Sequence, residues 1–293
     1  MLSATSHLLQ EALVRSLRGF ILALPVLTAC ADGGTTSPPS TPRTDRPSLS
    51  VAVTSAACGD VIVSDLRLEN DLVCVGDGLT VSATGVRINL HGHSISGNGT
   101  GVGIRVNASQ DVSIQDGTIR GFLQGMFVAS STGIVIKNNE LTQNATAVLL
   151  QASSGNTIKA NIARQNSVRA FMFRPNLTGV VSTDNDVVDN DIIDNPTGIL
   201  LISQPGNTFN GNTISGSTVA AIDMTSPPGA SGNVIKGNLL TTSAVGIRLA
   251  GGWTGNTIRG NTLQANSCAL QGPTAGNTLQ GNTFAGNSAN LCP

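Results

Sequence analysis

The sequence predicts an all-β fold: a parallel β-helix (solenoid) of about nine turns, each made of three short strands. Of its 293 residues, 34 are Gly and 26 are Asn, and both are poor helix formers. The hydrophobic share of 40% is too high for a disordered chain. A phrase close to Gly-Asn-Thr-Ile recurs along the chain, and repetition every 20 to 50 residues or so is typical of solenoids.

The N-terminus (residues 1–30) has the layout of a secretory signal. Arg15 and Arg18 precede an apolar run over residues 19–27, which is too short to span a bilayer as a mature helix. The run ends in Leu27-Thr28-Ala29-Cys30, which resembles the lipobox of bacterial lipoproteins, with Cys30 as the lipidated residue. An ordinary cleavable signal that ends near a cysteine is the alternative.

Residues 31–49 are rich in Pro, Ser and Thr and predict an extended tether, which leaves residues 50–293 for the folded domain. Ala31 stands where an Asp would resemble an inner-membrane retention signal, so we expect an exported lipoprotein at the outer membrane, in the periplasm or at the cell surface. The net charge of −1 gives no footprint for nucleic acid. Any membrane contact is therefore expected through the lipid anchor only.

Four further cysteines support export: Cys58, Cys74, Cys268 and Cys292. Three connectivities are possible, of which Cys58–Cys74 with Cys268–Cys292 is the local one. These two pairs would each staple one end of the stack, where a solenoid exposes its core. A metal site is the alternative, but no Cys-x-x-Cys spacing supports it.

The apolar last residue of the recurring phrase marks the turns. Successive markers lie 21 to 29 residues apart: Ile88, Ile114, Ile136, Ile158, Val187, Phe209, Ile235, Ile258 and Leu279. A second apolar column follows five residues later, and a third position carries apolar pairs at i and i+2, as in Ile104 and Val106. That spacing indicates strands with alternate residues pointing inward.

Asparagines occupy the bends, three and eight residues after most markers, as in Asn139 and Asn144. Asparagine tolerates the left-handed backbone that a bend requires, and stacked copies can hydrogen-bond along the axis. We expect these residues to be structural.

The segment over residues 58–97, followed by the Gly-Asn-Thr-Ile turns, resembles bacterial parallel β-helix repeat proteins of the NosD-like and CASH (carbohydrate-binding and sugar hydrolase) groups. The resemblance covers roughly residues 55–293 and implies a right-handed helix with pectate-lyase-like architecture. It argues against an enzyme, because the Asn-Thr-Asp, Asp-Asp, Gly-His-Gly and Arg-Ile-Lys signatures of polygalacturonase-like members and the Asp-Pro-His-Asp motif of alginate epimerase-like members are absent.

The outward residue of the third strand is apolar in four consecutive turns: Phe127, Leu149, Met172 and Leu200. An exposed apolar ridge is typical of a ligand or partner surface. The longest insertion, over residues 174–186, follows this ridge and contains Asp184. Trp253 lies on the same edge and could stack on a sugar or, alternatively, cover apolar surface. A groove beside the ridge is therefore the candidate site, unless the loops cover the ridge.

Other residues suggest weaker sites. Asp186 and Asp191 are expected to point outward, on different strands, and could act as acid and base on a glycoside or hold Ca²⁺, although Asp is also common at bends. His91 and His93 could bind copper, but without Met or Cys neighbours they supply few copper ligands, and His93 is expected to lie in a turn.

Three functions remain open. The chain could be a non-catalytic module that binds a polysaccharide or an envelope protein through one face. It could be a polysaccharide lyase or glycoside hydrolase with an atypical acidic site. It could also be a structural spacer. The first is favoured, with no cofactor beyond a possible Ca²⁺.

Overall fold

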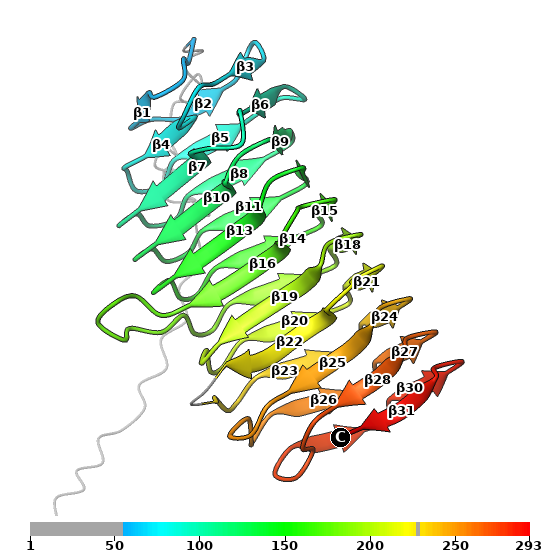
Figure 1. Cartoon of the computed structure of the whole chain (residues 1–293). Coiled ribbons are helices and arrows are strands. Elements are labelled where there is room, and N and C mark those ends of the chain that lie inside the picture. Colours follow the sequence, from blue (N-terminus) through cyan, green and yellow to red (C-terminus); the bar gives the residue numbers. More distant parts are fainter. Residues whose placement is uncertain (1–54, 227–228) are drawn as a thin grey trace, which may run out of the picture. The chain divides into compact units, whose positions relative to one another are not determined.

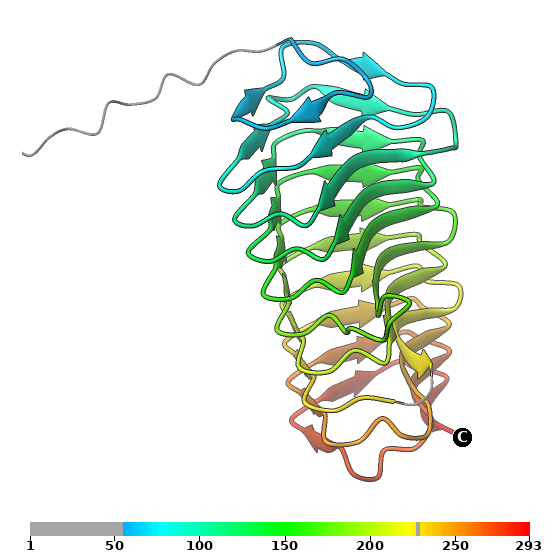
Figure 2. The same cartoon turned by 90° about the vertical axis from the view of Figure 1, so that its left-hand side faces the viewer.

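The computed structural model describes residues 55–226 and 229–293. The predicted signal, Cys30 and the tether lie outside these residues. Every regular element in the described part is a β-strand, and none of its residues form a helix able to span a bilayer. The strands form three parallel sheets, and each turn of the chain passes through sheets A, B and C in that order. Figures 1 and 2 show the turns stacked along one axis.

Sheet A has 11 strands and faces the viewer in Figure 1. Most of its strands are longer than those of the other sheets: β1 (Val61–Ile62), β4 (Leu79–Val81), β7 (Val102–Asn107), β10 (Gln124–Ala129), β13 (Thr146–Gln151), β16 (Arg169–Arg174), β19 (Thr197–Ile202), β22 (Ala220–Ser226), β25 (Val245–Leu249), β28 (Cys268–Gln271) and β31 (Ala289–Cys292).

Sheets B and C have 10 strands each. Sheet B contains β2 (Leu66–Arg67), β5 (Arg87–Asn89), β8 (Ser113–Gln115), β11 (Val135–Lys137), β14 (Thr157–Lys159), β17 (Asp186–Val188), β20 (Thr208–Asn210), β23 (Val234–Lys236), β26 (Thr257–Arg259) and β29 (Thr278–Gln280). Sheet C contains β3 (Leu72–Val73), β6 (Ser94–Ser96), β9 (Thr118–Arg120), β12 (Glu140–Thr142), β15 (Ile162–Arg164), β18 (Asp191–Ile193), β21 (Thr213–Ser215), β24 (Leu239–Thr241), β27 (Thr262–Gln264) and β30 (Thr283–Ala285).

The predicted parallel β-helix is confirmed, and so is its register. The markers pair in an unbroken column down sheet B, from Ile88 against Ile114 to Ile258 against Leu279. One turn was missing from the prediction: Leu66 pairs with Ile88, so the stack begins one turn earlier. The segment around Leu66 lacks the Gly-Asn phrase, and its strands β1, β2 and β3 have only two residues each.

The interior is a single column of apolar side chains held at the corners by stacked amides. Asn161, for example, is 1% exposed. Its Nδ2 donates hydrogen bonds to the carbonyl oxygens of Ile136 and Lys159 and to the Oδ1 of Asn190. Three such ladders run along the axis. Two were predicted. The third begins at Asn156 and uses the Asn of the recurring phrase itself.

We predicted asparagine at the bends because it tolerates a left-handed backbone, and this reason was wrong for the buried asparagines. The left-handed residue is the one before the buried asparagine, as at Asn138, Ala160 and Asp189, with φ of 54°, 52° and 53°. The buried asparagine is chosen for its hydrogen bonds, because its amide can both donate and accept.

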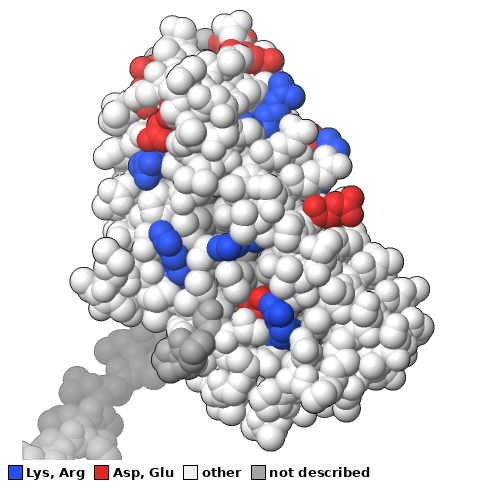
Figure 3. Space-filling view, viewed as in Figure 1, with Lys and Arg blue, Asp and Glu red and all other residues white. Residues whose placement is uncertain are grey.

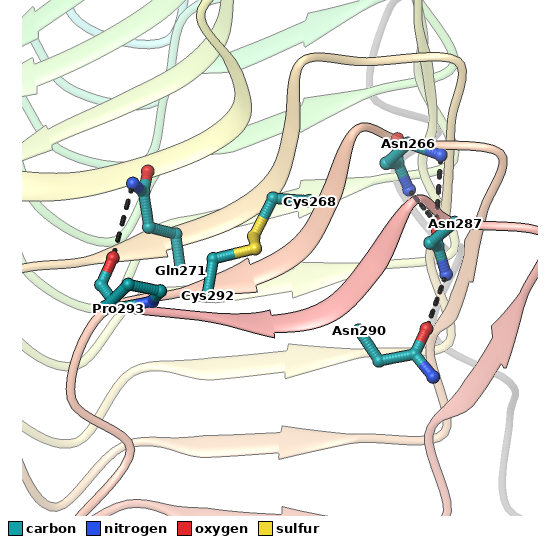
Figure 4. Close-up of a disulfide and its surroundings, with 7 residues drawn as sticks. All are labelled: Asn266, Cys268, Gln271, Asn287, Asn290, Cys292 and Pro293. Atoms are coloured by element: carbon teal, nitrogen blue, oxygen red, sulfur yellow. Dashed lines mark hydrogen bonds between the residues drawn. A yellow bond between two sulfur atoms is a disulfide. The ribbon is translucent and has the colours of Figure 1, made fainter.

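Both predicted disulfides are present, Cys58–Cys74 and Cys268–Cys292. The second joins β28 to β31, the last two strands of sheet A (Figure 4). Asn266 and Asn287 continue an asparagine ladder beside it, since the Asn266 Nδ2 donates to the Asn287 Oδ1 across 3.2 Å. Covalent and hydrogen-bonded links therefore meet at the C-terminal turns.

Candidate functional site

The predicted ridge lies on the outer face of sheet A. Along each strand the inward residues fill the core and the residue between them points outward. These outward residues pair in register over seven turns: Arg105, Phe127, Leu149, Met172, Leu200, Asp223 and Arg248. The apolar residues therefore form one continuous column, as the spacing predicted.

The column is less exposed than predicted. Leu149 is only 2% exposed and Met172 only 8%, although neither belongs to the interior cluster. Phe127 and Leu200 are half-buried. Cationic side chains help to cover the column, because the Arg105 guanidinium lies 5.5 Å from the centre of the Phe127 ring and the Arg169 Nη1 lies 2.7 Å from the Met172 Sδ. The ridge is thus a recessed apolar strip between longer side chains, which we call the apolar floor.

Charges are sparse on this face, which Figure 3 shows as a mostly uncharged surface with scattered blue and red groups. Two of its arginines are neutralised: Arg105 pairs with Asp77 across 3.1 Å, and Arg248 pairs with Asp223 across 2.5 Å. Asp223 is 4% exposed, so its carboxylate is largely shielded from water, whereas the Arg248 side chain is 30% exposed. Both carboxylates of this face are therefore engaged by arginines.

Arg169 and Arg174, at the two ends of β16, behave differently. No ion pair among the described residues includes either of them. The Nε of Arg174 is buried and has no hydrogen-bond partner. Burial, and then the positive charge of Arg174, lower the pKa of Arg169, and Asp223 opposes this only in part. Leaving a cationic donor buried and unpaired costs free energy, which an anion bound here would recover.

The longest insertion borders this arginine pair. It projects beyond the end of β16 (Figure 1) and is folded around Asn176, whose Oδ1 accepts the main-chain N–H groups of Thr178 and Val180. Leu177 at its tip is fully exposed. The Gln151 Nε2 donates to the Pro175 carbonyl oxygen across 3.3 Å and ties the loop base to sheet A. The loop therefore stands beside the outer face.

The acidic residues do not converge on one site. Asp184 is an exposed turn residue with φ of 54°. Asp186 and Asp191 point outward on different strands, as predicted: Asp186 begins β17 in sheet B and Asp191 begins β18 in sheet C. The corner at Asp189 separates the two faces. The prediction of an acid and base acting together, or of one Ca²⁺ site, is therefore not supported by this placement.

Trp253 is 1% exposed and packs in the main core. The prediction that it stacks on a sugar is wrong for this structure, because its ring lies in the hydrophobic core; the alternative, that it covers apolar surface, fits this burial. Its role is to fill the core where the loop returns towards β26.

A polar cleft on sheet C escaped prediction. It has a volume of about 370 Å³ and is lined by, among others, Arg120, Glu140, Arg164 and Gln165. The Arg164 Nε donates to Glu140 across 2.7 Å, and the Arg120 Nε donates to Ser96 across 2.9 Å. The signal was present in the sequence, since Arg120 and Arg164 occupy the same outward strand position two turns apart.

The chain matches the family described as periplasmic copper-binding protein (NosD), over residues 59–176 and again over residues 174–292. It belongs to the NosD family. A periplasmic family and two disulfides are both typical of an exported protein. No curated protein shows significant similarity to this NosD-family chain.

Solved structures share the fold at low identity. The A-module of the Azotobacter vinelandii mannuronan C-5 epimerase AlgE6 has a TM-score of 0.63 and 17% identity, over 81% of this chain and 78% of that one. The periplasmic alginate epimerase AlgG has a TM-score of 0.56 and 15% identity, over 75% and 73%. The Dettilon tailspike protein has a TM-score of 0.59 and 13% identity, over 77% and 55%.

The family description raises the question of copper, and the described residues of this NosD member do not fit a copper site. His91 is the turn residue, with φ of 50°, whereas His93 precedes β6. The His91 Nε2 faces the Arg67 guanidinium, which would repel a metal cation, and the His93 Nδ1 lies 3.3 Å from Asp71. No cluster of three or more His, Cys, Asp or Glu able to hold a metal exists in the described ranges, and the four cysteines there form disulfides.

Proposed function

We propose that this NosD-family protein is a non-catalytic binding module of the cell envelope that holds an acidic polysaccharide on the outer face of sheet A. The observation that carries the proposal is the arginine pair of β16. Arg169 and Arg174 flank the apolar floor at Met172, lack carboxylate partners among the described residues, and include a buried donor without a partner. A uronate offers what this surface lacks, a carboxylate beside the apolar face of a sugar ring.

The face is better suited to binding than to catalysis. A lyase or hydrolase needs a free acid and base close together. The acids on this part of the face, Asp77 and Asp223, are both engaged by arginines. Two structural neighbours are named as epimerases of mannuronan and alginate, which makes uronate polymers the first ligands to try. Anchoring through Cys30, with the tether at residues 31–49, would hold such a module at the membrane.

The test compares binding of uronate oligosaccharides to residues 50–293 and to the Arg169→Gln/Arg174→Gln variant by calorimetry. We expect the variant to lose about tenfold in affinity, because two charge-assisted contacts disappear. Gln is preferred to an acidic substitution at Leu149, since Leu149 is buried and Leu149→Asp would disturb the fold.

Arg120→Gln/Arg164→Gln is the matched control, as it removes two cations from sheet C and should leave binding unchanged. Equal affinity of the double variant and the parent would overturn the proposal. Mass spectrometry of the same mixtures against a heat-inactivated sample tests the alternative. New oligosaccharides would show an enzyme and exclude the non-catalytic proposal.

A further inference from the structure

The three lysines of the chain all stand at one position of the repeat. Lys137, Lys159 and Lys236 are each the last residue of a strand of sheet B. Arg259 occupies the same position in β26. These side chains point outward, since the residue before each of them is buried. We call the outward column from Lys137 to Arg259 the basic stripe; its members are Lys137, Lys159, Val188, Asn210, Lys236 and Arg259.

The stripe places like charges directly opposite each other. Lys137 pairs in register with Lys159, and Lys236 pairs with Arg259. Like charges on facing positions of neighbouring strands destabilise a sheet. No ion pair within the described residues offsets this, because none includes any of the four cations. The column therefore carries two cation pairs without ion-pair partners, at the two ends of a span of about 24 Å, at about 4.8 Å per turn.

The residues on both sides of the stripe have short side chains or none. On one side stand short side chains two residues earlier on the same strands, among them Val135, Thr157, Val234 and Thr257. On the other side, towards sheet C, the corner residues beside the second cation pair are Gly237 and Gly260. A hollow of about 470 Å³ lies there, lined by Lys236, Arg259 and these glycines. The long cationic side chains thus border space that a ligand can occupy.

Acidic residues interrupt the stripe at its centre. Asp186 lies beside the stripe in the turn that contributes Val188, and Asp189 occupies its corner. Both carboxylates are exposed. The stripe therefore consists of two cation pairs separated by one acidic turn and by Asn210. This arrangement suits a polymer that carries a charge on successive units better than a single small anion.

We propose that the basic stripe binds a linear, carboxylate-bearing polysaccharide laid along the helix axis. One hexuronate unit is about as long as one turn is high, so a chain that lies along the axis can bring a carboxylate to each of the two cation pairs. The members of the stripe include no aromatic side chain for stacking on bases, which single-stranded nucleic acid sites generally use. The stripe lies on sheet B, away from Arg169 and Arg174, and the inference does not rest on the function proposed for sheet A.

The test uses polyuronates of graded length, from dimers to chains longer than the stripe. Binding to residues 50–293 is measured at low and at physiological salt. We expect affinity to rise with chain length and to fall with salt, as for any multivalent contact between exposed charges. The Lys137→Gln/Lys159→Gln and Lys236→Gln/Arg259→Gln variants should each lose about tenfold in affinity for the long chains. Asp186→Asn should raise it, because it removes the opposing carboxylate.

Two controls separate this inference from others. Arg120→Gln/Arg164→Gln makes the same change in net charge on sheet C and should keep the dependence on chain length. The Arg169→Gln/Arg174→Gln variant should keep it as well, even if its affinity for short oligomers falls. The proposal is overturned if the stripe variants bind long polyuronates like the parent, or if they lose no more than the sheet C control. Equal length-dependent binding of single-stranded DNA would overturn the assignment of a polysaccharide.

Discussion

Asn161 and Asn190 are joined by two hydrogen bonds across one turn of the helix. The Oδ1 of Asn190 accepts the main-chain N–H of Asn161 and its Nδ2, each across 3.0 Å. Asn190 repeats the pattern one turn further, donating both groups to Asn212. Both Asn161 and Asn190 are almost completely buried. Each amide is therefore both the acceptor for the preceding turn and the donor to the next.

Replacement of one ladder residue should be costly. Asn190→Ala leaves the Asn161 N–H without its acceptor and removes one donor each from the carbonyl oxygens of Ile158 and Val188, of which Val188 keeps the main-chain N–H of Ala160. A buried unpaired group costs about 1–3 kcal/mol and each further lost hydrogen bond about 1 kcal/mol, so we expect a loss of about 3 kcal/mol in the free energy of unfolding. Chemical denaturation measures it.

Asn138→Ala is the matched control, because Asn138 is exposed and Ala160 adopts the same left-handed conformation one turn later. We expect a change of less than about 1 kcal/mol there. Comparable losses in the two variants would contradict the assigned role of the ladder.

The C-terminal disulfide should protect the last turns selectively. Cys268 and Cys292 are 24 residues apart and join β28 to β31. Closing a loop of this length is worth about 3 kcal/mol. In Cys268→Ala/Cys292→Ala we therefore expect faster amide hydrogen exchange in β28 and β31.

The Cys58→Ala/Cys74→Ala variant should instead expose the first turn, because that bridge spans 16 residues at the other end. Unchanged protection of β31 after loss of Cys268–Cys292 would show that strand pairing alone holds the terminus.

The register of the solenoid could be predicted because each turn repeats the same geometry. Ile114 and Ile136 occupy equivalent positions, so one apolar residue in each repeat locates the next. The first turn escaped because Leu66 lies in a segment without the phrase. The third asparagine ladder escaped because Asn156 belongs to that phrase, which was used only as a marker.

The surface was harder to predict than the core. The prediction that the Leu149 side chain points outward was right. The exposure of the outward column, however, depends on how far longer side chains such as Arg105 and Arg169 reach across the sheet. Asp186 and Asp191 are close in sequence yet lie on different faces, because a sharp corner stands between them. The alignment of Lys137 with Lys159 could have been found from the marker register, by reading one residue past each marker.

Asp71 should make stability depend on pH in the acid range. The main-chain N–H of Ser94 donates to its Oδ1 across 2.8 Å and, together with a weaker contact from His93, lowers the pKa of Asp71. A carboxylate with a lowered folded-state pKa stabilises the protein above its unfolded value of about 3.9 and loses that contribution as pH falls through the folded value.

The difference in melting temperature between the parent and Asp71→Asn should therefore be present at pH 6 and shrink below about pH 4. His93→Ala should keep most of this dependence, because the Ser94 hydrogen bond is the larger cause. The effect is expected to be small, since the carboxylate is exposed. A difference that stays constant down to pH 2 would show that Asp71 does not act through its charge.

Trp253 offers an optical test of where ligands bind, because it is the only tryptophan in the chain. Its ring is 1% exposed, so its fluorescence should be blue-shifted and poorly quenched by acrylamide. Saturating polyuronate should leave the spectrum almost unchanged, since both proposed binding surfaces lie on sheet faces rather than at this turn. Trp253→Ala should lower the free energy of unfolding by about 3–5 kcal/mol through the cavity it leaves. Strong quenching by a bound saccharide would instead mean that the turn opens and that Trp253 contacts sugar after all.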